Sequence, residues 1–462
     1  MEYLAGQLGR WGAGLTIDDV PADVVLATQK ALLNTIGTTL GAFELEDVQR
    51  ALEIAKVDGE SGRSTVFVDG SKLPLMSALF VNGVMCNTLG QEETHPVSGT
   101  HPAETTIPAV LALAEMRRLS GRTVLEAVLT GIETTVAVAK MALTPAVKYD
   151  NCEAPAVYGT VGAAAAAGRA LGLDPERLGH AIALGANFAG GLSECVRIGT
   201  SEYHYSVGNA STHGVLAALL AEAGKPAAPS ALEGPAGFYQ LFGAAPREAL
   251  ASHDVAADVM GNLSVGWDVL DLIYKPYPVY FFNQVHIDGA RALREAHQIS
   301  PEAVDAIRIT INPLAAASGG LNTRAPGERE AGLGSTAFCV AAMFTRGRMT
   351  LADTLAFDDA DIGRLMARTT IVPSDSMAAA RLEVDAGGET LVFDAETSGR
   401  DYRLGFDEVA GIFHQALDGI LPREQADAIE AEVRRLPDVP DAGQLVDLLS
   451  RGAIFPGSEP LR

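Results

Sequence analysis

Residues 159–168 read GTVGAAAAAG, a run of small residues that is typical of a helix inside a packed bundle. Its side chains are small, so other helices can approach it closely in a packed bundle. Helix start signals lie on both sides of it. Asp174-Pro175 reads as an N-cap followed by proline at the first helical position. Thr123-Val-Leu-Glu126 reads as a capping box, after which apolar residues recur at helical spacing as far as Val136. The first 260 or so residues are therefore predicted to be almost wholly helical.

The pattern changes near residue 265. In residues 306–311, apolar and polar side chains alternate and many are β-branched, as in a strand. Residues 380–393 read as a hairpin that turns at Gly387-Gly388. Helical patterns return in the region from residue 407 to residue 449. Two further helical patterns lie inside the β-rich block, at residues 336–344 and 359–367.

These patterns predict a mostly α fold with two parts. A large all-helical domain is built from both chain ends, residues 1–268 and 398–462. A small α+β domain, residues 269–397, is inserted between them.

The charge balance narrows the class of function. With 34 Lys+Arg against 58 Asp+Glu, the 462-residue chain carries a formal net charge of −24. Such a chain repels phosphate backbones and anionic lipid, so we expect no nucleic-acid partner and no membrane partner. The four cysteines lie far apart, and the first residues lack a basic segment followed by an apolar core. We therefore expect a cytoplasmic protein without a signal peptide.

Several common catalytic motifs are missing from the sequence, including the zinc-protease, nucleophile-elbow, phosphate-loop and EF-hand patterns. His95 and His101 with Glu92 and Glu93 could chelate a metal. A single short polar loop more often carries acid–base chemistry or caps a helix. We therefore expect no cofactor and no metal.

Two segments concentrate polar side chains that could act on a substrate. Residues 90–102, GQEETHPVSGTHP, combine carboxylates, imidazoles and hydroxyls in a loop between predicted helices. They either cap the following helix or share protons with a substrate near neutral pH. Residues 274–282, YKPYPVYFF, place Lys275 among aromatic side chains, in a chain that has seven lysines beside 27 arginines. In an apolar setting this ammonium needs an anionic partner or a reacting oxyanion, and the alternative is a surface lysine with a buried stem.

Two further candidates have equally plain structural alternatives. Residues 197–214 form a polar interruption between apolar helices and offer Tyr203 and His204, although an N-cap and loop would explain the same residues. Glu153 precedes the small-residue helix, and its carboxylate could simply complement that helix N-terminus.

Taken together, the motifs resemble the MmgE/PrpD family, which includes 2-methylcitrate dehydratase, cis-aconitate decarboxylase and iminodisuccinate epimerase. The resemblance runs in order along nearly the whole chain. The matching segments are Asn82-Gly83, Glu92-Glu93-Thr94 with His101-Pro102, residues 157–173, Gly208-Asn-Ala with His213-Gly214, residues 233–238 and Lys275-Pro-Tyr-Pro278.

The resemblance implies a cleft between a helical and a small α+β domain, and a homodimer. It also implies a shared chemistry: a proton beside a carboxylate is removed or moved without a cofactor, and water or CO₂ is then lost or the proton returns. His101 would be an acid–base residue with Glu93 and Thr94 beside it. Lys275 would bind a substrate carboxylate or an oxyanion.

The sequence departs from the family pattern at several of the implied cleft positions. Glu153 and Tyr280 replace family histidines, Asn87 replaces another, and Tyr203 replaces a lysine, with His204 beside it. Each lost charge-assisted hydrogen bond is worth roughly 1.5–3 kcal/mol. We therefore expect a small-molecule substrate with fewer carboxylates than methylcitrate or aconitate, and with a neutral or cationic group facing Glu153.

Three functions remain open from the sequence. The favoured one is a hydro-lyase that dehydrates a small hydroxy acid other than a tricarboxylate, with His101 or Tyr203 taking the proton. Lys275, Thr94 and Tyr280 would stabilise the charge that develops. An isomerase or epimerase would use the same carbanion, and decarboxylation is a further possibility. A catalytically inactive dimeric member of the family is the third reading.

Overall fold

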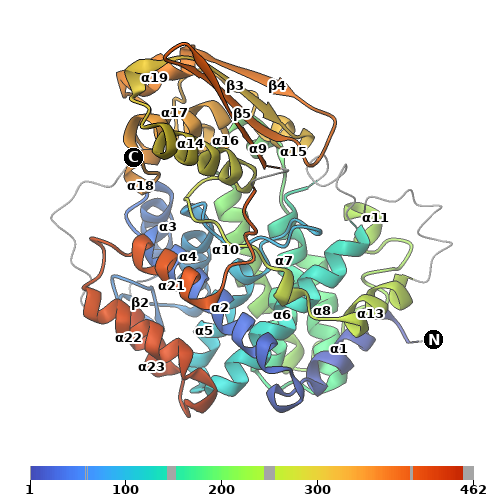
Figure 1. Cartoon of the computed structure of the whole chain (residues 1–462). Coiled ribbons are helices and arrows are strands. Elements are labelled where there is room, and N and C mark those ends of the chain that lie inside the picture. The colour runs from blue at the N-terminus through green and yellow to red at the C-terminus, as the bar shows by residue number, and fades with distance from the viewer. Residues whose placement is uncertain are drawn as a thin grey trace.

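The computed structural model of the chain describes residues 2–57, 59, 61–142, 152–243, 255–395 and 399–450. It is mostly helical with a small sheet, so the predicted mostly α class is confirmed (Figure 1). Within the ranges described, no helix combines the length and the apolar character needed to cross a membrane.

The larger hydrophobic cluster draws on both ends of the chain. It holds side chains between Leu4 and Tyr274 and again between Leu404 and Leu449. The C-terminal helices, red in Figure 1, lie beside the blue N-terminal ones. The elements around this cluster are α1 (Leu4–Gly14), η1 (Ile17–Asp19), α2 (Ala22–Gly41), α3 (Glu46–Val57), β1 (Ser64–Thr65), β2 (Lys72–Leu73), α4 (Leu75–Thr88), α5 (Pro102–Arg117), α6 (Gly121–Ala142), α7 (Ala154–Ala170), α8 (Pro175–Phe188), α9 (Glu194–Ile198), α10 (Tyr203–Glu222), α11 (Phe238–Phe242), α13 (Val255–Val265), η2 (Asp268–Asp271), α21 (Phe406–Ala416), α22 (Arg423–Arg434), η5 (Leu436–Asp438) and α23 (Gly443–Leu449).

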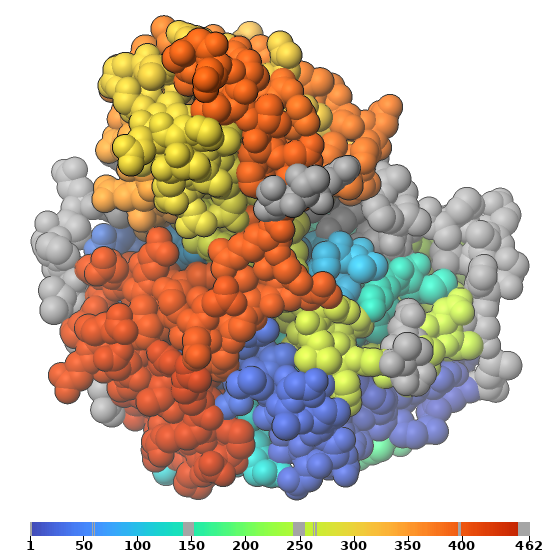
Figure 2. Space-filling view, in the orientation of Figure 1, coloured from blue at the N-terminus to red at the C-terminus, as the bar shows by residue number. Residues whose placement is uncertain are grey.

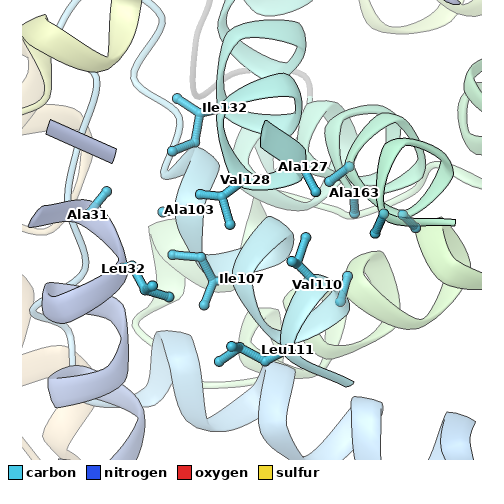
Figure 3. Close-up of a cluster of buried hydrophobic side chains, with 14 of the residues drawn as sticks. Ala31, Leu32, Ala103, Ile107, Val110, Leu111, Ala127, Val128, Ile132 and Ala163 are labelled. Atoms are coloured by element: carbon cyan, nitrogen blue, oxygen red, sulfur yellow. The ribbon is translucent and has the colours of Figure 1, made fainter. Parts of the chain in front are cut away.

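Helix α7 is the small-residue helix, and it is buried along almost its whole length. A Cβ atom added at Gly162 would overlap the Thr135 hydroxyl of α6, and one at Gly159 would lie 2.6 Å from the Thr105 hydroxyl of α5. The helices therefore meet at backbone distance, as the sequence predicts. Figure 3 shows a neighbouring part of this core, where Ile107 of α5 and Val128 of α6 point toward one another.

The second hydrophobic cluster lies between Tyr277 and Val384 and is built around a four-stranded sheet of order β4-β3-β5-β6. Strand β3 runs parallel to β4 and antiparallel to β5, and β5 and β6 form the predicted hairpin. Figure 2 shows this part, in yellow and orange, above the helical part. Its elements are η3 (Phe281–Asn283), α14 (Gln284–His297), η4 (Pro301–Ala303), β3 (Val304–Ile311), α15 (Pro313–Ala317), α16 (Arg329–Gly334), α17 (Thr336–Arg346), α18 (Leu351–Thr354), α19 (Ala360–Ala367), β4 (Thr369–Pro373), β5 (Ala380–Ala386) and β6 (Glu389–Asp394). The boundaries at residues 268/269 and 397/398 stay predictions.

Two local predictions were wrong. Helix α6 begins at Gly121, before Thr123, and the hydroxyl of Ser120 accepts the Thr123 amide. Glu126 instead accepts from the Arg169 guanidinium at 2.7 Å and from the Ile17 backbone amide at 3.0 Å, two donors far from it in the sequence. Residues 203–214 are not a loop, since they form the first three turns of α10.

Candidate active site

A cavity of about 230 Å³ lies where the two hydrophobic clusters approach each other. This volume lies a little below the range usual for drug-sized ligands and suits a small molecule. Its lining residues are Asn87 in the last turn of α4; Glu92, Thr94, Pro96, Gly99 and His101 after α4; Cys152, Glu153, Ala154 and Pro155 at the start of α7; Ser193, Val196 and Tyr203 around α9 and α10; Lys275, Tyr280, Phe281 and Phe282; and Asn312, Leu314, Ser318 and Met377.

Two segments that are distant in sequence are joined on one side of this cavity. Thr94 and Ile273 exchange two backbone hydrogen bonds of 2.9 Å. The Gln91 amide donates to the carbonyl oxygens of Lys275 and Pro276, each at 3.0 Å. These bonds hold the loop after α4 against the aromatic segment that carries Lys275.

Lys275 has the anionic partner that its apolar setting requires. Its ammonium lies 2.5 Å from Glu92 Oε1, and both side chains are almost wholly buried. Burial raises the pKa of Glu92, while the charge of Lys275 and, when the ring is protonated, that of His101 lower it, and the net direction is downward. Glu92 is therefore a carboxylate, and the pair carries no net charge.

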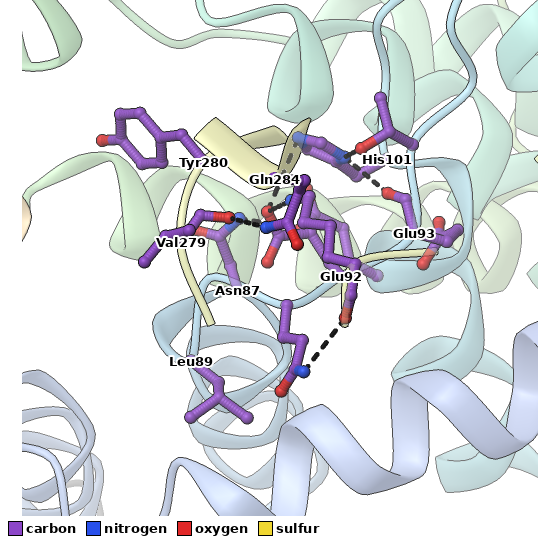
Figure 4. A network of polar contacts seen from close by, with 12 residues as sticks. Asn87, Leu89, Glu92, Glu93, His101, Val279, Tyr280 and Gln284 are labelled. Atoms are coloured by element: carbon purple, nitrogen blue, oxygen red, sulfur yellow. Dashed lines mark hydrogen bonds and ion pairs between the residues drawn. The ribbon is translucent and has the colours of Figure 1, made fainter. Parts of the chain in front are cut away.

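The hydrogen bonds of His101 define which ring nitrogen can exchange a proton with a substrate. Its Nδ1 lies 2.5 Å from the carbonyl oxygen of Glu93 and 3.2 Å from the Thr94 hydroxyl. A carbonyl oxygen only accepts, so Nδ1 carries the proton. In the neutral ring Nε2 then holds the lone pair, and this atom lies 3.6 Å from Glu92 Oε1 (Figure 4). His101 is thus arranged to accept a proton through Nε2.

Glu93 points away from the cavity and caps a helix. Its Oε1 accepts the Ala103 amide at 2.7 Å, at the N-terminus of α5. Burial is the main cause that raises the pKa of Glu93 to about 7. Because Glu93 is not among the lining residues, it acts on the site through the carbonyl that holds His101.

Glu153 both caps a helix and lines the cavity, the two roles that the sequence left open. Its carboxyl Oε2 accepts the Ala156 amide at 2.6 Å and so caps α7, and the same side chain lines the cavity. Burial, with repulsion from Glu92, raises the pKa of Glu153 to about 8. At neutral pH the cavity therefore faces a largely protonated carboxylic acid, which can donate a proton.

A buried hydrogen-bond chain runs behind the cavity wall. Asn87 donates to Glu104 at 2.8 Å and accepts from His204 Nδ1 at 2.5 Å. His204 Nε2 lies 3.3 Å from Glu330 Oε1, and Glu330 Oε2 accepts from the Tyr203 hydroxyl at 2.8 Å. Burial opposes ionisation of Glu330, but His204 and Arg329 outweigh it and its pKa is lowered. This series of hydrogen bonds fixes the position of the Tyr203 phenol.

The two phenols of the cavity lie together. Tyr203 Oη is 3.3 Å from Tyr280 Oη. Burial, reinforced by the charge of Glu330, raises the pKa of each well above its ordinary value. Both are neutral at physiological pH, so neither is suited to remove a proton. Because Tyr203 already donates its hydroxyl proton to Glu330, Tyr280 is the phenol that can donate a hydrogen bond to an oxyanion.

The structure brings most of the predicted site residues together. His101, Lys275, Tyr203, Thr94, Glu153 and Tyr280 all line the cavity. Glu93 and His204 lie behind it, in contact with residues that line it.

Sequence reasoning gave Glu92 no separate role and missed Glu330. The signal for Glu92 is the extended course of its segment, where neighbouring side chains point to opposite sides. Glu92 and Thr94 therefore face the cavity while Glu93 faces α5. Glu330 has no local signal, since its contact with Tyr203 spans 127 residues.

One further cluster of polar groups, outside this cavity, has the spacing of a metal site. His95, Asp268 and Asp271 present ligand atoms within 4.8 Å of one another. Lys140 makes an ion pair with Asp268, so this carboxylate already has a cationic partner. The sequence-based alternative of a chelate formed by His95, His101, Glu92 and Glu93 is not among the potential metal clusters of the described residues.

Comparison with protein families gives matches over both parts of the chain. The MmgE/PrpD N-terminal domain matches residues 6–249, and the MmgE/PrpD C-terminal domain matches residues 277–438. The resemblance drawn from the motifs is therefore confirmed.

Comparison with curated proteins gives distant relatives. The chain is 28% identical to cis-aconitate decarboxylase of Homo sapiens over 297 residues, which are 63% of this chain and 59% of that protein. It is 25% identical to cis-aconitate decarboxylase of Aspergillus terreus over 245 residues, or 52% of this chain and 50% of that protein. A cis-aconitate decarboxylase-like protein of Aspergillus oryzae is 23% identical over 97% of both chains.

Proposed function

Because the chain belongs to the MmgE/PrpD family, we propose that it is a cofactor-independent lyase that removes a proton beside a carboxylate. The favoured reaction is dehydration of a small hydroxy acid. The observation that carries this proposal is the grouping of His101, Glu92 and Lys275 in one cavity, where His101 Nε2 and the Lys275 ammonium both approach Glu92 Oε1.

Each step of such a reaction has a suitable group in the cavity. The substrate carboxylate would lie near Lys275, and His101 Nε2 would take the adjacent proton. Negative charge that develops on the carboxyl oxygens would be stabilised by Lys275 and by the phenol of Tyr280. Glu153, protonated near neutral pH, would give a proton to the departing hydroxyl.

The family's tricarboxylate chemistry does not transfer simply to this chain. Glu92 already neutralises Lys275, and Glu153, a neutral acid near pH 7, offers no positive charge. A substrate with several carboxylates would bring charges that these residues do not balance. We therefore propose a substrate with fewer carboxylates than methylcitrate or aconitate. The predicted homodimer and cytoplasmic location stay predictions.

Epimerisation is the second candidate, because Glu153 is a second acid–base group beside His101 in the same cavity. Return of a proton from a second group to the carbanion would invert the centre without loss of water.

Proton NMR of the purified protein in D₂O, with a panel of hydroxy, unsaturated and amino acids, tests both reactions. New vinylic signals are expected for dehydration, and deuterium beside the carboxylate without net product would indicate epimerisation. His101→Gln is the matched control and is expected to abolish either signal. A panel that includes mono-, di- and tricarboxylates and gives no exchange would favour the inactive family member.

A further inference from the structure

The cavity has two chemically different walls. Glu92, Thr94, His101 and Lys275 form a polar wall on the side of the helical cluster. Phe281, Phe282, Leu314 and Met377, here called the apolar wall, come from residues 281–377, and none of these four side chains can hydrogen-bond a carboxylate. Tyr280, Asn312 and Ser318 also line the cavity from this part of the chain and offer uncharged polar groups. A ligand that satisfies both walls is itself polar at one end and apolar at the other.

The polar wall provides for one anionic group. Among the described residues that line the cavity, Lys275 is the single lysine and there is no arginine. Its charge is shared with Glu92 at 2.5 Å, with His101 Nε2 3.6 Å from the same oxygen. A second carboxylate on the ligand would be buried without a cation, which is costly.

Two side chains of the apolar wall are still exposed to solvent. Met377 lies between β4 and β5 with 52% of its surface exposed, and it also lines the cavity. Leu314 of α15 is partly exposed at the same cavity. Apolar groups of a ligand that cover these side chains would be removed from water along with them.

We propose that this cavity takes an acid with one carboxylate and an apolar substituent, the carboxylate lying toward Lys275 and the substituent against Phe281, Leu314 and Met377. The inference rests on the proposed function, since it places the reacting carboxylate at Lys275. It goes further by naming the class of molecule.

Isothermal titration of the full-length protein at pH 7 with 3-hydroxybutanoate, 3-hydroxyhexanoate and 3-hydroxyoctanoate tests this directly. The affinity is expected to rise about fourfold for each added methylene group, equivalent to about 0.8 kcal/mol of burial. Malate and citrate are expected to bind at least tenfold more weakly than 3-hydroxyhexanoate. Equal or tighter binding of malate or citrate, or an affinity that does not rise with chain length, would overturn the inference.

Deuterium exchange in the same samples separates this inference from the proposed function. A rise of affinity with chain length but no exchange in any sample would support the ligand class and count against the lyase. Exchange with citrate or malate, bound more tightly than the alkyl acids, would support the lyase and overturn the ligand class.

A gain of specificity provides an independent test. Leu314→Arg places a second cation on the apolar wall, and it is expected to strengthen malate binding at least tenfold while weakening 3-hydroxyoctanoate binding. Ala317→Arg is the matched control, since Ala317 is exposed on the same helix and does not line the cavity. An equal effect of the two substitutions on malate binding would contradict the assignment of the apolar wall.

Discussion

The buried pair of Lys275 and Glu92 allows a quantitative prediction. Lys275→Met removes the ammonium and keeps most of the volume of the side chain. It leaves the Glu92 carboxyl, which has 6% of its side chain exposed, without its closest cation. The variant should be less stable than the parent protein, and the loss should depend on pH.

The geometry gives the size of the effect. At 2.5 Å and an effective dielectric constant of about 20, the attraction between two unit charges is about 7 kcal/mol. Desolvation offsets part of this attraction, and removal of one partner of a buried pair typically costs about 3–5 kcal/mol. With an unfolding entropy of about 2.1 cal/mol/K per residue over 462 residues, each kcal/mol lowers a cooperative Tm by about 1 °C.

The pH dependence follows from Glu92. In the parent protein its pKa lies below the ordinary value, so the pair adds stability above the unfolded-state pKa and loses it as the pH falls. Without Lys275 burial dominates and the pKa rises above that of the unfolded chain. The variant then loses stability as the pH rises from about 4.5, by up to about 1.4 kcal/mol per pH unit. Its deficit should therefore be larger at pH 8 than at pH 5.

Calorimetry of four proteins measures this interaction: the parent, Lys275→Met, Glu92→Gln and the double variant. Since the double variant leaves neither charge buried, its loss of stability should be smaller than the sum of the two single losses. Additive losses, or a Lys275→Met variant as stable at pH 8 as the parent protein, would refute the ion-pair reasoning.

Other residues lead to further predictions. His101→Gln should lower proton exchange by about 10²- to 10⁴-fold, with a fall in Tm of only about 1 °C for the lost hydrogen bond to Glu93. His213→Gln, which alters a different cavity, should leave exchange unchanged in the same NMR assay. Glu153→Gln retains an acceptor for the Ala156 amide but removes a group whose pKa is about 8. The folded parent protein binds this proton more tightly than the unfolded chain, so its stability falls as the pH rises from about 4.5 to 8. In the variant, this dependence of the unfolding free energy on pH should be smaller by about 1.4 kcal/mol per pH unit, as measured by denaturant titrations. Gly162→Ala should destabilise α7 by about 1–3 kcal/mol, because the added Cβ would overlap Thr135. Gly363→Ala, at a helical position with open space around it, should instead add about 0.5–1 kcal/mol in the same unfolding measurement.

Local sequence patterns predicted the elements whose physical cause is local. The N-cap at Asp174 and the hairpin around Gly387 are set by residues within a few positions of each other, and both are present in the structure. The start of α6 was missed because Thr123 and Ser120 both have the chemistry of a cap, and the sequence alone does not decide which one the backbone uses.

The candidate site could be predicted in part. Lys275 was recognisable from its apolar neighbours, and its need for an anion was clear, but the sequence did not distinguish Glu92 from Glu93. That choice depends on the bridge between Thr94 and Ile273, which fixes the direction of each side chain. The link from Tyr203 to Glu330 depends on a tertiary contact and leaves no pattern in the sequence.

The long separation between the paired residues of the site has a consequence for the time course of folding. Glu92 and Lys275 are 183 residues apart in the sequence, and Tyr203 and Glu330 are 127 apart. Individual helices form from local contacts, whereas these pairs require closure of very long loops. During refolding, the circular-dichroism signal of the helices should therefore return before ligand binding does. Recovery of ligand binding would therefore indicate that the whole chain has folded, whereas recovery of the helical signal would not.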